Sequence, residues 1–97
     1  MKAIFIPCDQ AFNEDVLNIL KTYNVRGYTG WDEVQGKGSK TGEPHLGSHA
    51  WPSLNYAVLV AVDDDKVKPI LTALKELDST SNVLGLRAFV WNIEEMY

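Results

Sequence analysis

The chain has 97 residues, of which 45% are hydrophobic, and a formal net charge of −4, which is typical of one globular domain with a modest core. The acidic balance argues against nucleic acid as a partner, because such binding normally requires a basic patch. The single cysteine, Cys8, excludes an internal disulfide framework. The apolar run near the N-terminus is too short for a signal peptide or a membrane span. We therefore expect one cytoplasmic domain over residues 1–97, without membrane insertion.

The first third of the chain predicts a strand, a helix and a weaker strand. The apolar, β-branched run from Lys2 to Pro7 is typical of a strand. Asn13 is the predicted N-cap of a helix that carries acids in its first turn and apolar residues at helical spacing. Asn24 is expected to end this helix, because Asn tolerates the left-handed conformation. Residues 25–35 then predict a strand in which two glycines weaken the pairing or mark a bulge.

The last third predicts strand, helix and strand. Residues 54–62 form the clearest strand and are apolar on both faces after Asn55, which indicates burial on both sides. The acids at 63–65 are better explained as a helix N-terminus than as a metal site. An amphipathic helix is predicted to follow, with apolar residues from Val67 to Leu77. Residues 86–93 close the pattern with a strand that is apolar on both faces.

The resulting order is strand, helix, strand, long loop, strand, helix, strand. This is the ferredoxin-like βαββαβ pattern of the α+β class, an antiparallel four-stranded sheet with two helices on one face. Two helices cannot cover the second face, yet the third and fourth strands are apolar on both sides. Because exposed apolar patches of that size mark interaction sites, we expect an oligomer that packs through the sheet.

The segment from Arg26 to Ser53 is too long for an ordinary connection and predicts a functional loop. It holds six of the seven glycines and both histidines. In its run Gly36-Lys37-Gly38-Ser39-Lys40, glycines permit close backbone approach and lysines supply positive charge. We therefore predict ligand contacts at Gly36, Lys37, Gly38 and Lys40. The spacing does not match a Walker A loop, which requires an upstream glycine and a following helix.

Two parts of this region resemble the P-II signal-transduction family. They are Val25-Arg26-Gly27-Tyr28-Thr29 and the following Glu33-Val34-Gln35-Gly36-Lys37-Gly38, which is similar to the base of that family's long T-loop. The resemblance implies a homotrimer with ligand clefts between subunits near the loop base. It further implies a non-enzymatic sensor that binds adenine nucleotides, and a T-loop, here about residues 36–53, that docks on a membrane transporter or a regulatory protein. A ligand that orders residues 36–42 would expose or hide the docking surface.

The chain also departs from the family pattern, and this makes it a divergent PII-like protein. One extra residue lies in the second strand around Gly30-Trp31-Asp32, and Lys37 replaces an aromatic residue. Residues 80–85 stand in place of the glycine- and lysine-rich phosphate-binding B-loop. The B-loop is the family's phosphate-binding segment, so the effector has to be established for this chain.

His45 and His49 suggest a second function, the binding of Zn or Cu. Two histidines are too few for a closed site, and Gly47 argues against a helix that would align them. The alternative is then a metal-binding trimer with a role like that of the CutA family, which shares the scaffold. No catalytic arrangement of Ser, His, Cys and Asp can be placed from the spacing, so we do not expect an enzyme.

Overall fold

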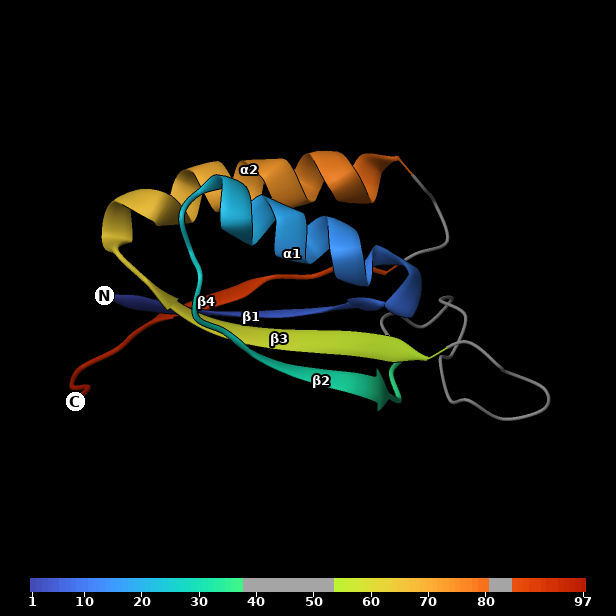
Figure 1. The fold of residues 1–97 in the computed structure, drawn as a ribbon, viewed down its shortest axis with the longest axis horizontal. Helices are drawn as coiled ribbons and strands as arrows, with labels where there is room; N and C mark the ends of the chain where they lie inside the picture. The colour runs from blue at the N-terminus through green and yellow to red at the C-terminus, as the bar shows by residue number, and fades with distance from the viewer. Residues whose placement is uncertain (38–53, 81–84) are drawn as a thin grey trace.

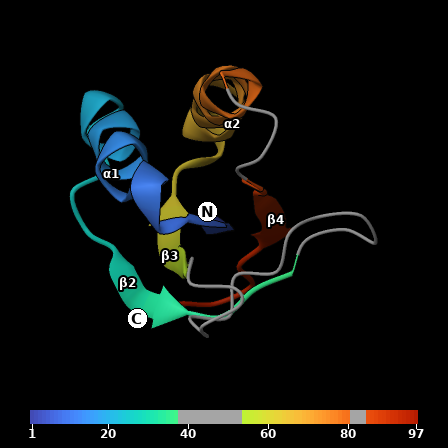
Figure 2. The same cartoon turned by 90° about the vertical axis from the view of Figure 1, so that its right-hand side faces the viewer.

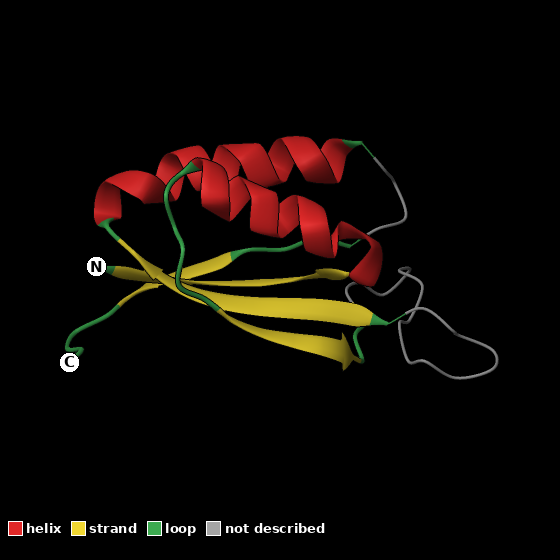
Figure 3. Cartoon of the chain, in the orientation of Figure 1, coloured by secondary structure: helices red, strands yellow, loops and turns green. Residues whose placement is uncertain are grey.

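The computed structural model describes residues 1–37, 54–80 and 85–97. The described elements are β1 (Lys2–Asp9), the 3-10 turn η1 (Gln10–Phe12), α1 (Asn13–Thr22), β2 (Thr29–Val34), β3 (Asn55–Val62), α2 (Asp64–Ser79) and β4 (Phe89–Asn92). The four strands form one antiparallel sheet in the order β2-β3-β1-β4. Both helices lie on one face of it (Figures 1 and 3). The predicted ferredoxin-like α+β fold is confirmed.

The core lies between the sheet and the helices, as the end-on view shows (Figure 2). On this face β1 and β3 contribute Ile4, Ile6 and Val58, which are fully buried. Ile70 and Leu74 of α2 pack against them in the same cluster. Alternate residues of each strand point to this side because side chains alternate along a strand.

The opposite face of the sheet carries apolar side chains without a helix to cover them. Phe5 pairs with Phe89, and Ala3 pairs with Trp91. Directly paired residues share a face, so the two aromatic residues of β4 lie on the side away from the core. Their exposed fractions are 53% for Phe89 and 49% for Trp91, and Trp31 of β2 is 43% exposed. The predicted apolar second face is present; we call it the open face.

The predicted start of the first helix was wrong by one position. Asn13 is already helical, with φ −48° and ψ −57°, and Phe12 occupies the N-cap without a side-chain bond. The reason is the turn η1, which Asp9 stabilises by accepting a hydrogen bond from the Ala11 N–H at 2.8 Å. At the other end Asn24 has φ 62°, which confirms the predicted left-handed residue.

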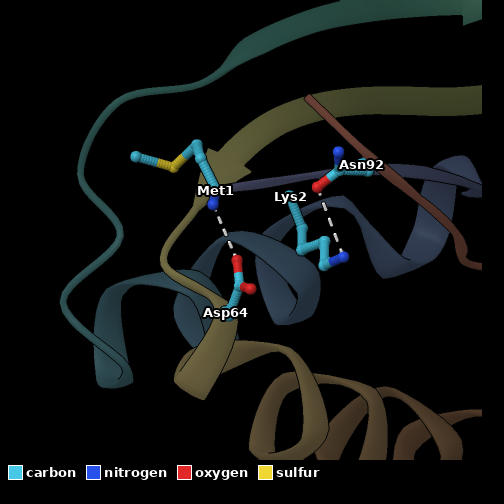
Figure 4. A network of polar contacts seen from close by, with 4 residues as sticks. All are labelled: Met1, Lys2, Asp64 and Asn92. Atoms are coloured by element: carbon cyan, nitrogen blue, oxygen red, sulfur yellow. Dashed lines mark hydrogen bonds and ion pairs between the residues drawn. The ribbon is translucent and has the colours of Figure 1, made fainter. Parts of the chain in front are cut away.

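The acids at 63–65 do begin a helix, as predicted, but no side chain caps it. Asp63 is the N-cap residue, with extended backbone and no side-chain cap bond. The carboxylate of Asp64 instead accepts a hydrogen bond from the N-terminal ammonium of Met1 at 2.7 Å (Figure 4). This contact joins the start of β1 to the start of α2. No helix in the described part of the chain is both long and apolar enough to cross a bilayer.

The second strand is shorter than predicted and contains a β-bulge. Trp31 pairs with Ala57 and Val34 pairs with Asn55, and the register shifts between the two pairs. Asp32 and Glu33 therefore share the place opposite Tyr56. The bulge adjoins residues 30–32, where the resemblance to the P-II pattern predicted one extra residue. It lies beyond the two glycines, which were expected to weaken the pairing or mark a bulge.

Candidate functional site

An open pocket of about 200 Å³ lies at the end of the sheet where β1 begins and β3 ends. It is lined by Met1, by residues 24–27 after α1, by residues 61–63 at the end of β3, and by Lys66 of α2. Segments far apart in the sequence therefore meet here. Small-molecule sites are usually larger, about 300–1,000 Å³, and combine a mostly apolar lining with a few convergent polar groups, so this pocket has the size of part of such a site.

The end of α1 directs the chain into this pocket. The Asn24 N–H donates to the Lys21 carbonyl at 3.0 Å, and the Val25 N–H donates to the Leu20 carbonyl at 2.8 Å. These bonds satisfy the last carbonyl groups of the helix while Asn24 turns left-handed. Val25 is buried and anchors the segment, so that Arg26 and Gly27 line the pocket.

The pocket carries charges of both signs. Arg26 and Lys66 supply cations, and Asp63 supplies a carboxylate. The neighbouring Asp64 is held by the N-terminal ammonium, whose hydrogen bond lowers the pKa of that carboxyl below its usual value. Lys2 lies next to this pair and donates to the Asn92 side chain at 3.4 Å (Figure 4). The cationic side chains of Arg26 and Lys66 suit an anionic ligand.

The pocket was not predicted, although two local signals could have indicated it. One is the helix end at Asn24, and the other is the break after Val62. Both were recognised as element boundaries. The pairing of β3 with β1 and β2 brings these two boundaries together in space. The order of elements alone does not predict that pairing.

The predicted ligand residues lie at the other end of β2. A Cβ on Gly36 would overlap the side-chain amide of Asn55, so a larger residue here would require the Asn55 side chain to shift, and Lys37 is exposed. Gly38 and Lys40 lie outside the described residues. In Figure 1, β2 runs from the end of the sheet near both chain termini to the opposite end. One copy of the chain therefore does not bring Gly36 and Lys37 to the pocket.

At the end of the sheet where β2 leads into the 36–53 segment, contacts with neighbouring residues hold the cationic residue Arg87 in place. The Leu86 N–H donates to an Asp78 carboxylate oxygen at 3.3 Å, and the Arg87 guanidinium lies 3.9 Å from the same carboxylate. The Arg87 N–H donates to the Pro7 carbonyl at 3.0 Å. Asp78 thus ties the chain before β4 to α2 and leaves Arg87 largely exposed.

The metal alternative stays a prediction. His45 and His49 lie outside the described residues. Among the described residues, no group of three or more His, Cys, Asp and Glu side chains could hold a metal ion. Cys8 is fully buried, and burial, with a smaller effect of Asp9, raises the pKa of its thiol to about 12. Cys8 is therefore a neutral core residue.

Comparisons with known proteins agree with this geometry. The family model described as Nitrogen regulatory protein P-II matches residues 1–97. No curated protein matches the chain. One similar solved structure is CPII from Thiomonas intermedia K12 bound to ADP and bicarbonate, with 23% identity, a TM-score of 0.68, and coverage of 93% of this chain and 86% of that one.

A second similar structure is a PII-like signalling protein from Thermus thermophilus. It has 22% identity and a TM-score of 0.71, with coverage of 95% of this chain and 85% of that one. At this identity the structures establish the shared fold, and the family match spans the whole chain. The chain belongs to the nitrogen regulatory protein P-II family.

Proposed function

We propose that this chain is a regulatory protein that senses an adenine nucleotide in a cleft completed by a neighbouring copy. The observation that carries the proposal is the open pocket beside Arg26 and Lys66 in a chain of the P-II family. The similar CPII protein was solved with ADP and bicarbonate, and also with ADP, AMP and bicarbonate. We take the ligand class from those structures, and the two cations would attract the phosphates.

The cleft has to be shared because its two halves lie at opposite ends of β2. From Gly27 to Gly36 the chain advances nine residues, roughly 30 Å at about 3.3 Å per residue. One nucleotide does not span that distance. A closed ring of copies in head-to-tail contact would place the loop base of one copy against the pocket of the next. Lys37 would then add a third cation, and Gly38 and Lys40 would belong to the same half-site.

The open face supports this assembly. Phe89, Trp91 and Trp31 are each about half exposed. Complete burial of a large apolar side chain contributes roughly 1.5–3 kcal/mol, so burial of the exposed half of each would contribute about 1 kcal/mol. We propose a homotrimer in which three open faces pack around a common axis. Each copy would then be held in the orientation that forms the clefts.

We further propose that the protein acts by binding and catalyses no reaction. Nucleotide bound in the cleft would contact Gly36 and Lys37, which are the described start of the 36–53 segment. A partner, a membrane transporter or a regulatory protein, would contact that segment. The partner would bind the nucleotide-bound and nucleotide-free protein with different affinities, and this difference would transmit the signal.

Titration calorimetry with ADP, ATP and AMP tests the ligand class. We expect one nucleotide per chain and a loss of affinity of about tenfold to a hundredfold for Lys66→Gln, since a charge-assisted hydrogen bond contributes roughly 1.5–3 kcal/mol. Lys68→Gln is the matched control, because Lys68 is exposed on the same helix and does not line the pocket. Absence of heat with all three nucleotides would remove the proposal.

A further inference from the structure

The end of β2 contains one residue more than its partner strand accommodates. Asp32 and Glu33 together occupy the place opposite Tyr56, between the pairs Trp31–Ala57 and Val34–Asn55. Glu33 has φ 56°, a left-handed conformation that disfavours any residue with a side chain. Such outliers persist only where the surrounding structure imposes them, and they cluster at switch regions. The question is what holds Glu33 in this state.

The part of β2 before the bulge is fixed in register. Thr29, Gly30 and Trp31 pair in sequence with residues of β3. A Cβ on Gly30 would overlap the hydroxyl of Tyr56, so the tyrosine side chain lies directly against the glycine. Tyr56 is only 5% exposed. A shift of this half would drive a side chain into Tyr56, so any change of register is confined to the residues after Trp31.

The part after the bulge is held by a different contact. Gly36 lies so close to the Asn55 side chain that no Cβ fits between them. If Glu33 took ordinary extended backbone, it would pair with Asn55, and Gln35 would move into the place of Gly36. The Cβ of Gln35 would then overlap the Asn55 amide. The left-handed conformation of Glu33 and the close fit of Gly36 therefore oppose each other.

We propose that the end of β2 is a two-state register switch. In the bulged state seen here, Val34 pairs with Asn55; in the regular state, Glu33 does. The change moves residues 34–37 by one position, about 3.3 Å along β3, and turns each of their side chains to the other face. In the proposed function, on which this step rests, Gly36 and Lys37 contact nucleotide, and a ligand that binds one register better would then select that register.

Relaxation-dispersion NMR of backbone amides tests the switch in the full-length protein. We expect exchange at residues 32–37 and none at residues 29–31. Glu33→Gly removes the penalty of the left-handed conformation, so the regular state should fall at least fivefold in population and the exchange should be lost. Gly36→Ala should raise that population. Glu33→Gln is the matched control, because it removes the charge and keeps the backbone preference, and its exchange should match that of the wild type.

Deletion of Glu33 tests the register switch without any side-chain substitution. Without Glu33, Asp32 can face Tyr56 while Val34 still pairs with Asn55, so exchange should disappear. Absence of exchange in the wild type, or exchange that Glu33→Gly leaves unchanged, would overturn the switch. ADP calorimetry separates the two ideas: exchange without ADP binding removes the proposed function alone, and ADP binding without exchange removes the switch alone.

Discussion

The two faces of the sheet are built from similar residues and meet different surroundings. On one face Ile4 and Val58 are fully buried beneath the helices, whereas on the other Phe89 and Trp91 are about half exposed. The buried pair comes from β1 and β3 and the exposed pair from β4, and along each strand the side chains alternate between the two faces. One copy of the chain therefore explains the apolar residues of one face only. The proposed homotrimer would bury the apolar side chains of the open face, which no helix covers in the single chain.

The largest effect on stability is expected under the helices. Leu74 is 1% exposed in the core, so Leu74→Ala should lower the free energy of unfolding by about 2–5 kcal/mol through lost burial and a cavity. Urea denaturation at fixed protein concentration measures this. Lys75→Ala, on the exposed side of the same helix, should change it by less than about 0.5 kcal/mol. Equal effects would mean that the helix layer does not hold the core.

Charges on the open face should break the assembly and leave the single chain folded. We expect Phe89→Glu with Trp91→Glu to reduce the light-scattering mass from three times the 10.9 kDa chain to one chain mass, because carboxylates resist burial in an apolar contact. Thr72→Glu adds charge on the exposed side of α2 and should leave the mass unchanged. A double variant that keeps the wild-type mass would show that this face is not an interface.

A smaller effect is expected where β2 meets the covered face. Gly30→Ala places a Cβ against the Tyr56 hydroxyl, and such overpacking typically costs about 1–3 kcal/mol. Gly27→Ala is the matched control, since no atom lies within 4 Å of a Cβ there. Thermal unfolding compares the two variants. A Gly30→Ala protein as stable as Gly27→Ala would show that Tyr56 can move aside without cost.

The smallest effect at ordinary pH concerns Cys8. Its pKa is raised from 9.0 to about 12 in the folded chain, so between these values the unfolded chain loses the thiol proton first. The buried neutral thiol therefore makes its full contribution to the free energy of unfolding below pH 9. That contribution should fall as pH rises toward 12, by at most about 1.4 kcal/mol per pH unit. Urea denaturation across that range should show a shallower decline for Cys8→Ala. Identical slopes would contradict the buried, neutral thiol.

Much of the fold could be predicted from local pattern. The apolar run of residues 54–62 correctly predicted a strand, which the structure has at Asn55–Val62, and the left-handed Asn24 followed from its side chain. Asn13 was misplaced because Asp9, four residues earlier, begins a 3-10 turn. Such a turn carries no periodicity of its own to recognise.

The candidate site was predictable only at its loop base. Gly36 and Lys37 stood out through composition and through the resemblance to the P-II family. The pocket depends on strand pairing that brings residues 24–27 beside residues 61–63 and Met1, and no local signal encodes that neighbourhood. The bulge was visible only as one residue too many, because register is a property of two strands together.

The most direct test of the shared cleft mixes two damaged proteins. Lys66→Gln with Arg26→Gln damages the pocket, and Lys37→Glu damages the loop base. We predict that neither variant alone binds ADP measurably in calorimetry. Co-expression at equal levels should recover binding in one cleft of three in each mixed ring, which is about a quarter of all clefts when the rings assemble at random. In those clefts an intact pocket of one copy meets an intact loop base of the next. Mixed rings that bind no more ADP than either variant alone would contradict a site shared between copies.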